Sequence, residues 1–166
     1  DGKPFAVLFR DMENIRRYVF LNEVEEESLL SWRRPIVLLK QRRPLAPSIN
    51  PGMETLGCML PYMPIHFDWF ERLDTPALVM TSGNLSEYPI AITPEEAEKQ
   101  LAGKIPLLLH HNRDIHNRVD DSVLQVCGDQ PCLIRRSRGY VPEPFFADVP
   151  VEGILAFGAE KVNTFA

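Results

Sequence analysis

Residues 5–39 have the sequence FAVLFRDMENIRRYVFLNEVEEESLLSWRRPIVLL, in which apolar runs alternate with segments that carry helix signals. Residues 5–9 predict a short strand, and Asp11 stands at the N-cap position of a following helix. Residues 23–34 open with four glutamates and close with two arginines, a polarity that the helix dipole favours, and Pro35 ends this helix. Residues 36–39 predict a buried strand. This alternation indicates an α/β sheet.

The rest of the chain continues the alternation. Residues 42–61 are rich in proline and have no sustained period, which predicts a loop that ends in a short apolar stretch at residues 56–60. The sequence Thr93-Pro94-Glu95-Glu96 is a capping box and predicts a helix that ends near Leu101. Further elements expected from helical spacing or apolar runs are a helix around Ile65, Trp69 and Leu73, strands at 77–80, 105–109, 122–126 and 132–134, a proline-rich segment at 141–150 and a new strand from Gly153.

The composition is that of a globular domain. The 166 residues are 45% apolar and 25% charged, with a formal net charge of -5, and a chain of this length buries roughly 70% of its unfolded surface. No window approaches the roughly 20 apolar residues of a membrane span. Cys58, Cys127 and Cys132 form no C-x-x-C pair, which argues against a disulfide framework or a zinc ribbon and favours a reducing cytoplasm.

The sequence contains none of the standard phosphate-binding loops and no nucleophile elbow of the hydrolase type. Three polar clusters are the remaining candidates for a functional site. The first, residues 81–86, is either an ordinary turn or a ligand site at the end of a buried strand. The second, residues 110–122, has no pair with the helical spacing of a zinc motif. Its Asp120 and Asp121 either fix neighbouring arginines or hold Mg²⁺ together with a phosphate ligand.

The third cluster places Arg135, Arg136 and Arg138 close together in a chain of net negative charge. A solvated charge run is the usual explanation of such a cluster. Arginine forks, however, match phosphate oxygens two at a time, and Gly139 lets the backbone approach a ligand closely. We therefore favour an anion site here.

The order of these clusters resembles that of a known family. The residues that carry the resemblance are Lys3-Pro4-Phe5-Ala6-Val7, Leu60-Pro61-Tyr62, Ser82-Gly83-Asn84 with Pro89-Ile90, His111-Asn112-Arg113-Asp114-Ile115, Arg118 with Asp120-Asp121-Ser122-Val123, and residues 134–142. They are similar to motifs of the YrdC-like domain of the HypF family, the carbamoyltransferases that mature nickel-iron hydrogenases. The resemblance covers nearly the whole chain and implies a YrdC-like twisted mixed sheet with flanking helices.

The resemblance also implies a domain organisation. Residues 1–142 correspond to a YrdC-like nucleotide and carbamoyl-adenylate domain whose N-terminal part is missing. Residues 143–153 correspond to a linker, and residues 154–166 to the start of the next carbamoyltransferase domain. In this family a zinc-binding segment lies upstream, so zinc is expected only there. We expect this fragment to be inactive when it is alone.

The chemistry implied by the resemblance is carbamoyl transfer with ATP and Mg²⁺. The full enzyme would make carbamate from carbamoyl phosphate and condense it with ATP to carbamoyl adenylate. It would then pass the carbamoyl group to the C-terminal cysteine of a hydrogenase maturation partner in the cytoplasm, for synthesis of the cyanide ligand. No catalytic residue is assigned. By their places in the motifs, the resemblance implies that Lys3 and Arg138 bind phosphate oxygens. It implies that Ser82, Asn84 and Ser122 bind the nucleotide or the carbamoyl group, and that Arg113, Arg118 and Arg136 form the wall of the anion pocket. Mg²⁺ would be held by Asp120 and Asp121.

Two alternatives stay open at this point. A threonylcarbamoyl-adenylate synthase of tRNA modification shares the domain and the reaction type. The sequence of Leu60-Pro61-Tyr62 and that of residues 135–140 favour the hydrogenase family instead. A non-enzymatic RNA-binding module is a different class of function. The acidic balance of the chain, with a pI near 5.4, argues against nucleic acid as a partner.

Overall fold

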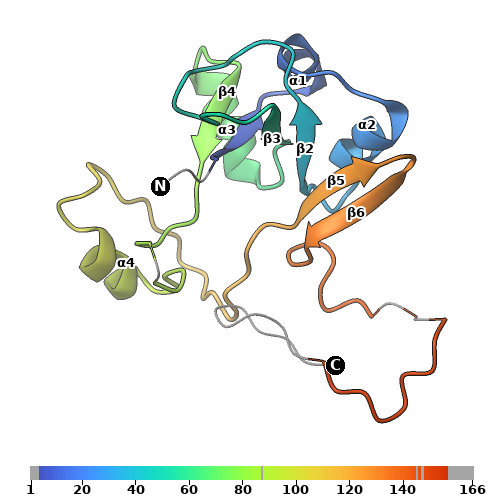
Figure 1. Cartoon of the computed structure of the whole chain (residues 1–166). Helices are drawn as coiled ribbons and strands as arrows, with labels where there is room; N and C mark the ends of the chain where they lie inside the picture. The colour runs from blue at the N-terminus through green and yellow to red at the C-terminus, as the bar shows by residue number, and fades with distance from the viewer. Residues whose placement is uncertain (1–3, 87, 145, 147, 157–166) are drawn as a thin grey trace. The chain divides into compact units, whose positions relative to one another are not determined.

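The computed structural model describes residues 4–86, 88–144, 146 and 148–156 (Figure 1). The chain divides into two compact units. The first unit comprises Asp1–Thr81 and Asp120–Pro142, and the second comprises Ser82–Val119 and Glu143–Ala166. Among the described residues, no helix is long and apolar enough to cross a membrane.

The first unit is built on a six-stranded mixed sheet with the strand order β4-β1-β3-β2-β5-β6. The pairs β1 with β3 and β2 with β5 are parallel, and the other three neighbouring pairs are antiparallel. This arrangement confirms the expected α/β mixed sheet. The strands are β1 (Ala6–Phe9), β2 (Ile36–Lys40), β3 (Thr55–Met59), β4 (Ala77–Met80), β5 (Val123–Cys127) and β6 (Gln130–Arg135).

Three helices flank this sheet: α1 (Met12–Tyr18), α2 (Glu23–Leu30) and α3 (Pro64–Arg72). The Asp11 carboxylate accepts the Asn14 backbone N–H at 2.8 Å, which confirms the expected N-cap. Helix α2 is shorter than the expected 23–34, because it begins at a capping box of Asn22 and Glu25 and ends before Ser31. The two arginines that follow it therefore belong to a loop and not to the last helical turn.

The two faces of the sheet carry separate hydrophobic clusters. Val7 and Phe9 of β1 face the cluster that includes Ile15 of α1 and Leu29 of α2. Leu8, between them in sequence, faces the other cluster, which includes Phe70 of α3. Side chains alternate across a strand, so α1 and α2 cover one face and α3 covers the other. A strand buried on both sides reads as a continuous apolar run, and this explains the apolar runs of β1 and β2.

Strand β3 has the most central role of the segments that the sequence left as loop. It pairs with β1 on one side and β2 on the other, and its residues 56–59 are buried. Gly57 suits this place because a Cβ atom there would lie 3.2 Å from Ile36 Cγ2. The expected apolar stretch at residues 56–60 is therefore confirmed, and residues 42–54 contain no helix or strand, as the predicted loop requires. The loop predicted over residues 42–61 is wrong for the residues of β3.

The second unit contains α4 (Pro94–Leu101), whose N-cap Thr93 accepts the Glu96 N–H at 3.1 Å as the capping box predicts. The strand expected at residues 105–109 is wrong. These residues form no strand, and Leu107 and Leu109 are 81% and 68% exposed. An apolar run becomes a strand only where a neighbouring strand takes its backbone hydrogen bonds, and none does so among the described residues. Residues 153–156 also form no strand, and 157–166 lie outside the described residues.

Candidate functional site

The arginine cluster lies where β5 begins and β6 ends, at the edge of the first unit. Ser122 directly precedes β5 and is fully buried. Its hydroxyl accepts the Ser137 backbone N–H at 2.8 Å and donates to the Arg138 carbonyl at 2.9 Å. Ser122 thereby fixes the backbone of residues 137 and 138 beside β5.

The Arg138 guanidinium is held from several sides. Its Nε donates to Asp121 Oδ1 at 2.9 Å, and its terminal nitrogens donate to the Arg33 and Arg34 carbonyls at 3.1 and 2.8 Å. Three of its five N–H groups therefore have protein acceptors. Its Cζ lies 3.7 Å from the centre of the Tyr62 ring, a close cation–π contact. This arrangement orients a half-buried positive charge before any ligand arrives.

Gly139 lies where the loop after α2, which carries Arg33, meets the loop after β6, which carries Arg138. Gly139 has φ +84, and its carbonyl accepts the Arg33 Nε–H at 2.9 Å. The Arg33 guanidinium in turn lies over the rings of Trp32 and Tyr140, at 4.7 and 4.9 Å from their centres. The loop after α2 and the loop after β6 are thus joined through both backbone and side chains.

Asp120 and Asp121, the two adjacent aspartates of the second cluster, both pair with arginines. Asp120 Oδ2 lies 3.2 Å from Arg135, and Asp121 Oδ1 lies 2.7 Å from Arg138. Of the two roles left open by the sequence, this geometry favours the fixing of arginines. Among the residues that the structure describes, no three His, Cys, Asp or Glu side chains gather as a metal site. The assignment of Asp120 and Asp121 to Mg²⁺ stays a prediction.

The Tyr62 ring lies between the Arg138 guanidinium and a second ring, that of His66, and the three groups form a stack. The Tyr62 ring meets that of the fully buried His66 edge to face, with centres 4.6 Å apart, and the Tyr62 backbone N–H donates to His66 Nδ1 at 3.4 Å. Burial raises the pKa of the Tyr62 phenol, and the Asp121 charge adds to this effect. Burial likewise lowers the pKa of His66, and the Arg138 charge lowers it further. Both side chains are therefore neutral near pH 7 and leave the site charge to arginine and aspartate.

We expect His66 to make the first unit less stable in acid. Because its pKa is lower in the folded than in the unfolded protein, its contribution is present above the ordinary histidine value and is lost as pH falls below it. The free energy of unfolding, measured with urea at pH 7 and pH 5, should fall less in His66→Gln than in the wild type. His116→Gln, at an exposed histidine, is the control and should follow the wild type. An equal fall in His66→Gln and the wild type would contradict the prediction.

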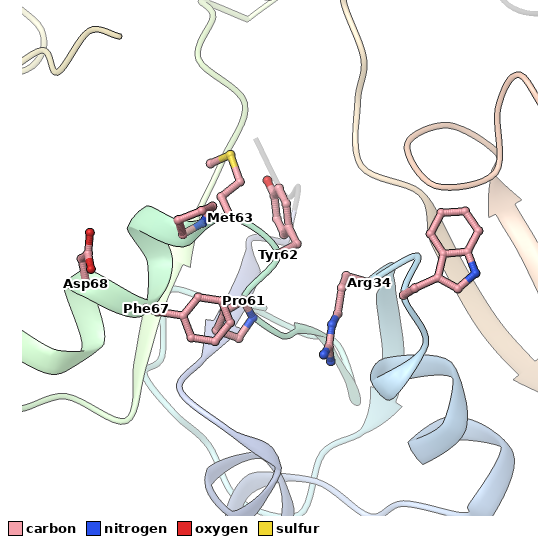
Figure 2. A pocket seen from close by; sticks show the side chains of 8 residues that line it. Arg34, Pro61, Tyr62, Met63, Phe67 and Asp68 are labelled. Atoms are coloured by element: carbon pink, nitrogen blue, oxygen red, sulfur yellow. The ribbon is translucent and has the colours of Figure 1, made fainter.

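An open pocket of about 580 Å³ lies beside this stack, on the surface of the first unit. Figure 2 shows Tyr62, Met63 and Phe67, from α3 and the segment before it, on one side and Arg34 on the other. Tyr62 belongs both to this pocket and to the contact with Arg138. The pocket is lined by Trp32, Arg34, Pro61, Tyr62, Met63, Pro64, Phe67 and Asp68.

Sequence reasoning assigned no site role to these pocket residues or to Arg33 and His66. The Leu60-Pro61-Tyr62 motif was the available signal for Tyr62. The paired arginines before Pro35 were a second signal, because a residue before proline is kept out of the helical region. The predicted helix over residues 23–34 included both arginines, so Arg33 and Arg34 were not expected at the site.

The second unit holds the other predicted residues. Ser82 and Arg113 are exposed, and Asn84 donates from Nδ2 to the Leu85 and Tyr88 carbonyls at 2.9 and 2.8 Å. Arg118 donates to the Ile90 carbonyl at 2.8 Å and pairs with Glu96 at 3.2 Å. The structure thus brings Asp120, Asp121, Ser122, Arg136 and Arg138 together in one unit and places Ser82, Asn84, Arg113 and Arg118 in the other. Lys3 lies outside the described residues.

Comparison with protein families gives a match over residues 1–137 to the Sua5_yciO_yrdC family, which is described as Telomere recombination. The chain is 40% identical over 171 residues to the carbamoyltransferase HypF of Rhizobium leguminosarum bv. viciae, covering 99% of this chain and 22% of that protein. It is 37% identical over 166 residues to the probable carbamoyltransferase HypF of Methanocaldococcus jannaschii, covering 98% and 21%. The chain therefore spans about a fifth of the length of these relatives.

The chain is also similar to solved structures, among them the following two. Full-length HypF in a phosphate- and nucleotide-bound form superposes with a TM-score of 0.82 at 50% identity, over 85% of this chain and 22% of that one. The E. coli protein YciO superposes with a TM-score of 0.66 at 22% identity, over 82% of this chain and 67% of that one. The second likeness shows the fold alone.

Proposed function

The chain belongs to the Sua5/YciO/YrdC domain family, and from this premise we propose that it is the carbamoyl-adenylate-forming part of a carbamoyltransferase. In the proposed step an oxygen of carbamate attacks the α-phosphorus of ATP. The bond from that phosphorus to the bridging oxygen breaks, and pyrophosphate leaves. Carbamoyl adenylate is the product.

The observation that carries this proposal is the similarity of nearly the whole chain to named carbamoyltransferases, at 37–40% identity. The similar structure in a phosphate- and nucleotide-bound form supports a nucleotide as the ligand. Structures related to the threonylcarbamoyl alternative share only 18–19% identity with the chain and support the fold alone.

The arginine cluster suits this reaction physically. Attack on a phosphoryl group needs little covalent help, but it needs fixed positive charge where negative charge develops on the leaving group. Arg138 is held by Asp121, by two backbone carbonyls and by the Tyr62 ring. A guanidinium oriented in this way loses little entropy when phosphate oxygens bind it. We therefore assign the pyrophosphate part of ATP to this cluster.

The remaining steps belong to the longer protein. We propose that it obtains carbamate from carbamoyl phosphate in the cytoplasm. It then passes the carbamoyl group to the C-terminal cysteine thiol of a hydrogenase maturation partner. ATP would bring Mg²⁺, an ion that usually keeps several waters and is held by substrate phosphates together with one or two carboxylates.

The test is carbamate-dependent exchange between labelled pyrophosphate and ATP, measured on the full-length protein. We expect exchange that requires carbamoyl phosphate or carbamate and is absent with threonine and bicarbonate. Exchange that requires threonine would overturn the proposal in favour of the tRNA-modification reaction. Salt-dependent binding of RNA without any exchange would overturn it in favour of a binding module.

We expect Asn84→Ala to slow this exchange while the melting temperature stays close to that of the wild type. The Asn84 Nδ2 bonds hold only the local turn, and its Oδ1 is buried with no hydrogen-bond partner among the described residues. An amide oxygen in that state is suited to accept a bond from a ligand. Asn84→Asp keeps an oxygen there but adds negative charge, so it should also slow exchange. A large loss of stability with normal exchange in the folded fraction would return Asn84 to a purely structural role.

A further inference from the structure

Two of the three cysteines lie on one face of the β5–β6 hairpin. In the hairpin register Cys127 is opposite Gln130, and Cys132 is opposite Gln125. Side chains two residues apart on a strand share a face, so Cys132 lies on the same face as Gln130 and hence as Cys127. The two cysteines are therefore diagonal neighbours across the strand pair.

Both thiols of the hairpin are open to solvent. Interaction with the Cys132 side chain raises the pKa of the Cys127 thiol. Both residues are exposed, whereas Cys58 is fully buried in β3 between its neighbouring strands. Burial raises the pKa of Cys58 strongly. A reagent in solution therefore reaches the hairpin pair and not Cys58.

The hairpin has room to bring the two sulfurs within bonding distance. Diagonal neighbours have Cα atoms about 7–8 Å apart, whereas disulfides span up to about 6.8 Å, so closure needs a backbone movement of about an ångström. The strands are joined by a two-residue turn in which Gly128 has φ +64, and a Cβ atom added to Gly128 would have nothing within 4 Å. Strand β6 is the last strand of the sheet and is exposed along its length. The tip is thus a part of the first unit where such a movement costs little packing.

We propose that Cys127 and Cys132 form a dithiol that closes reversibly to an intramolecular disulfide by exchange with a small-molecule disulfide such as oxidised glutathione. One thiolate attacks the glutathione disulfide, forms a mixed disulfide and releases the first reduced glutathione. The other thiolate then attacks the mixed disulfide, forms the Cys127–Cys132 bond and releases the second. The protein loses two electrons and two protons, and the two glutathione thiols gain them.

The hairpin that carries this pair also carries the candidate anion site. Strand β5 follows Ser122, and β6 ends at Arg135. The pairing of these strands has an irregularity between Val123 and Leu124, near that end of the hairpin. A cross-link at the tip fixes the register of both strands. The ring that it closes is short, so the chain-entropy gain is small, and the covalent state is a better readout than the melting temperature.

The experiment incubates the 166-residue chain with oxidised glutathione under native conditions, blocks free thiols by alkylation and measures the intact mass and the peptide map. We expect one disulfide that joins Cys127 to Cys132, one alkylated cysteine at position 58, and full reversal by dithiothreitol. Cys127→Ser and Cys132→Ser should each stop at a glutathione adduct. Cys58→Ser is the matched control and should close as the wild type does.

Three results would overturn the proposal. One is a stable glutathione adduct on both cysteines of the wild type, which would mean that the sulfurs do not meet. Another is two thiols that stay reduced. The third is closure at the same rate in concentrated urea, which would show that closeness in sequence, and not the folded hairpin, brings the thiols together.

Discussion

Replacing Arg138 by alanine should weaken ATP binding to the full-length protein by roughly ten- to hundredfold. Removal of a charge-assisted contact costs about 1.5–3 kcal/mol, which corresponds to this range. The same substitution removes the partner of Asp121 and of the Arg33 and Arg34 carbonyls. The expected result therefore combines a lost contact to phosphate with a less ordered loop, and calorimetric titration measures the sum.

Two matched variants separate these contributions. Arg138→Lys keeps the positive charge but not the planar fork that reaches three acceptors, so its ATP affinity should lie between those of the wild type and Arg138→Ala. Arg135→Ala removes a neighbouring arginine whose side chain is more exposed than that of Arg138, and it should have a smaller effect. Unchanged affinity in Arg138→Ala would contradict the assignment of this residue to the nucleotide.

Replacing Gly139 by alanine should lower the free energy of unfolding by about 2–5 kcal/mol. The left-handed conformation of a non-glycine residue costs about 1–2 kcal/mol, and overpacking adds about 1–3 kcal/mol. Gly139 has φ +84, and a Cβ atom would lie 2.8 Å from the Arg33 carbonyl oxygen and 3.0 Å from the Arg33 Cα. The atoms that would have to move are backbone atoms, so the cost is not relieved by a change of rotamer.

Gly128→Ala is the control for this substitution. Gly128 also has a positive φ, of +64, but nothing lies within 4 Å of its Cβ position. Its substitution should cost only the conformational part, about 1–2 kcal/mol. Chemical unfolding of both variants measures the difference, which reports the contact between the two arginine loops. Equal losses in the two variants would mean that this contact carries no stability.

The location of the site also clarifies what the arginines do. A solvated charge run was the main competing interpretation of residues 135–138. Arg135 fits that interpretation in part, since it is exposed and pairs with Asp120. Arg138 does not, because an aromatic ring, a carboxylate and two carbonyls fix its guanidinium. The role of Arg138 in binding ATP remains a prediction that the first experiment tests.

Local signals in the sequence were sufficient for most elements of the fold. The N-caps at Asp11 and Thr93 depend on contacts three residues away, and the apolar runs of β1 and β2 have the length of a strand buried on both sides. The comparisons with known proteins confirm the family resemblance. The motifs that carry it are short contiguous stretches spread along the chain, so they too can be recognised without knowledge of the fold. Such features are determined by near neighbours, which a single sequence displays.

Only the tertiary structure decided which distant segments meet. Strand β3 became central because β1 and β2 both pair with it, while residues 105–109 remained irregular for want of a pairing strand among the described residues. The contact of Arg138 with the Arg33 carbonyl joins residues 105 apart in sequence, and the Tyr62 ring reaches the same guanidinium from a third segment. The sequence does not show which backbone carbonyl or which ring face an arginine will contact, because every residue has a carbonyl and most aromatic rings lie in cores. The sheet brings these groups together, and in doing so it sets the charge and the shape of the candidate site.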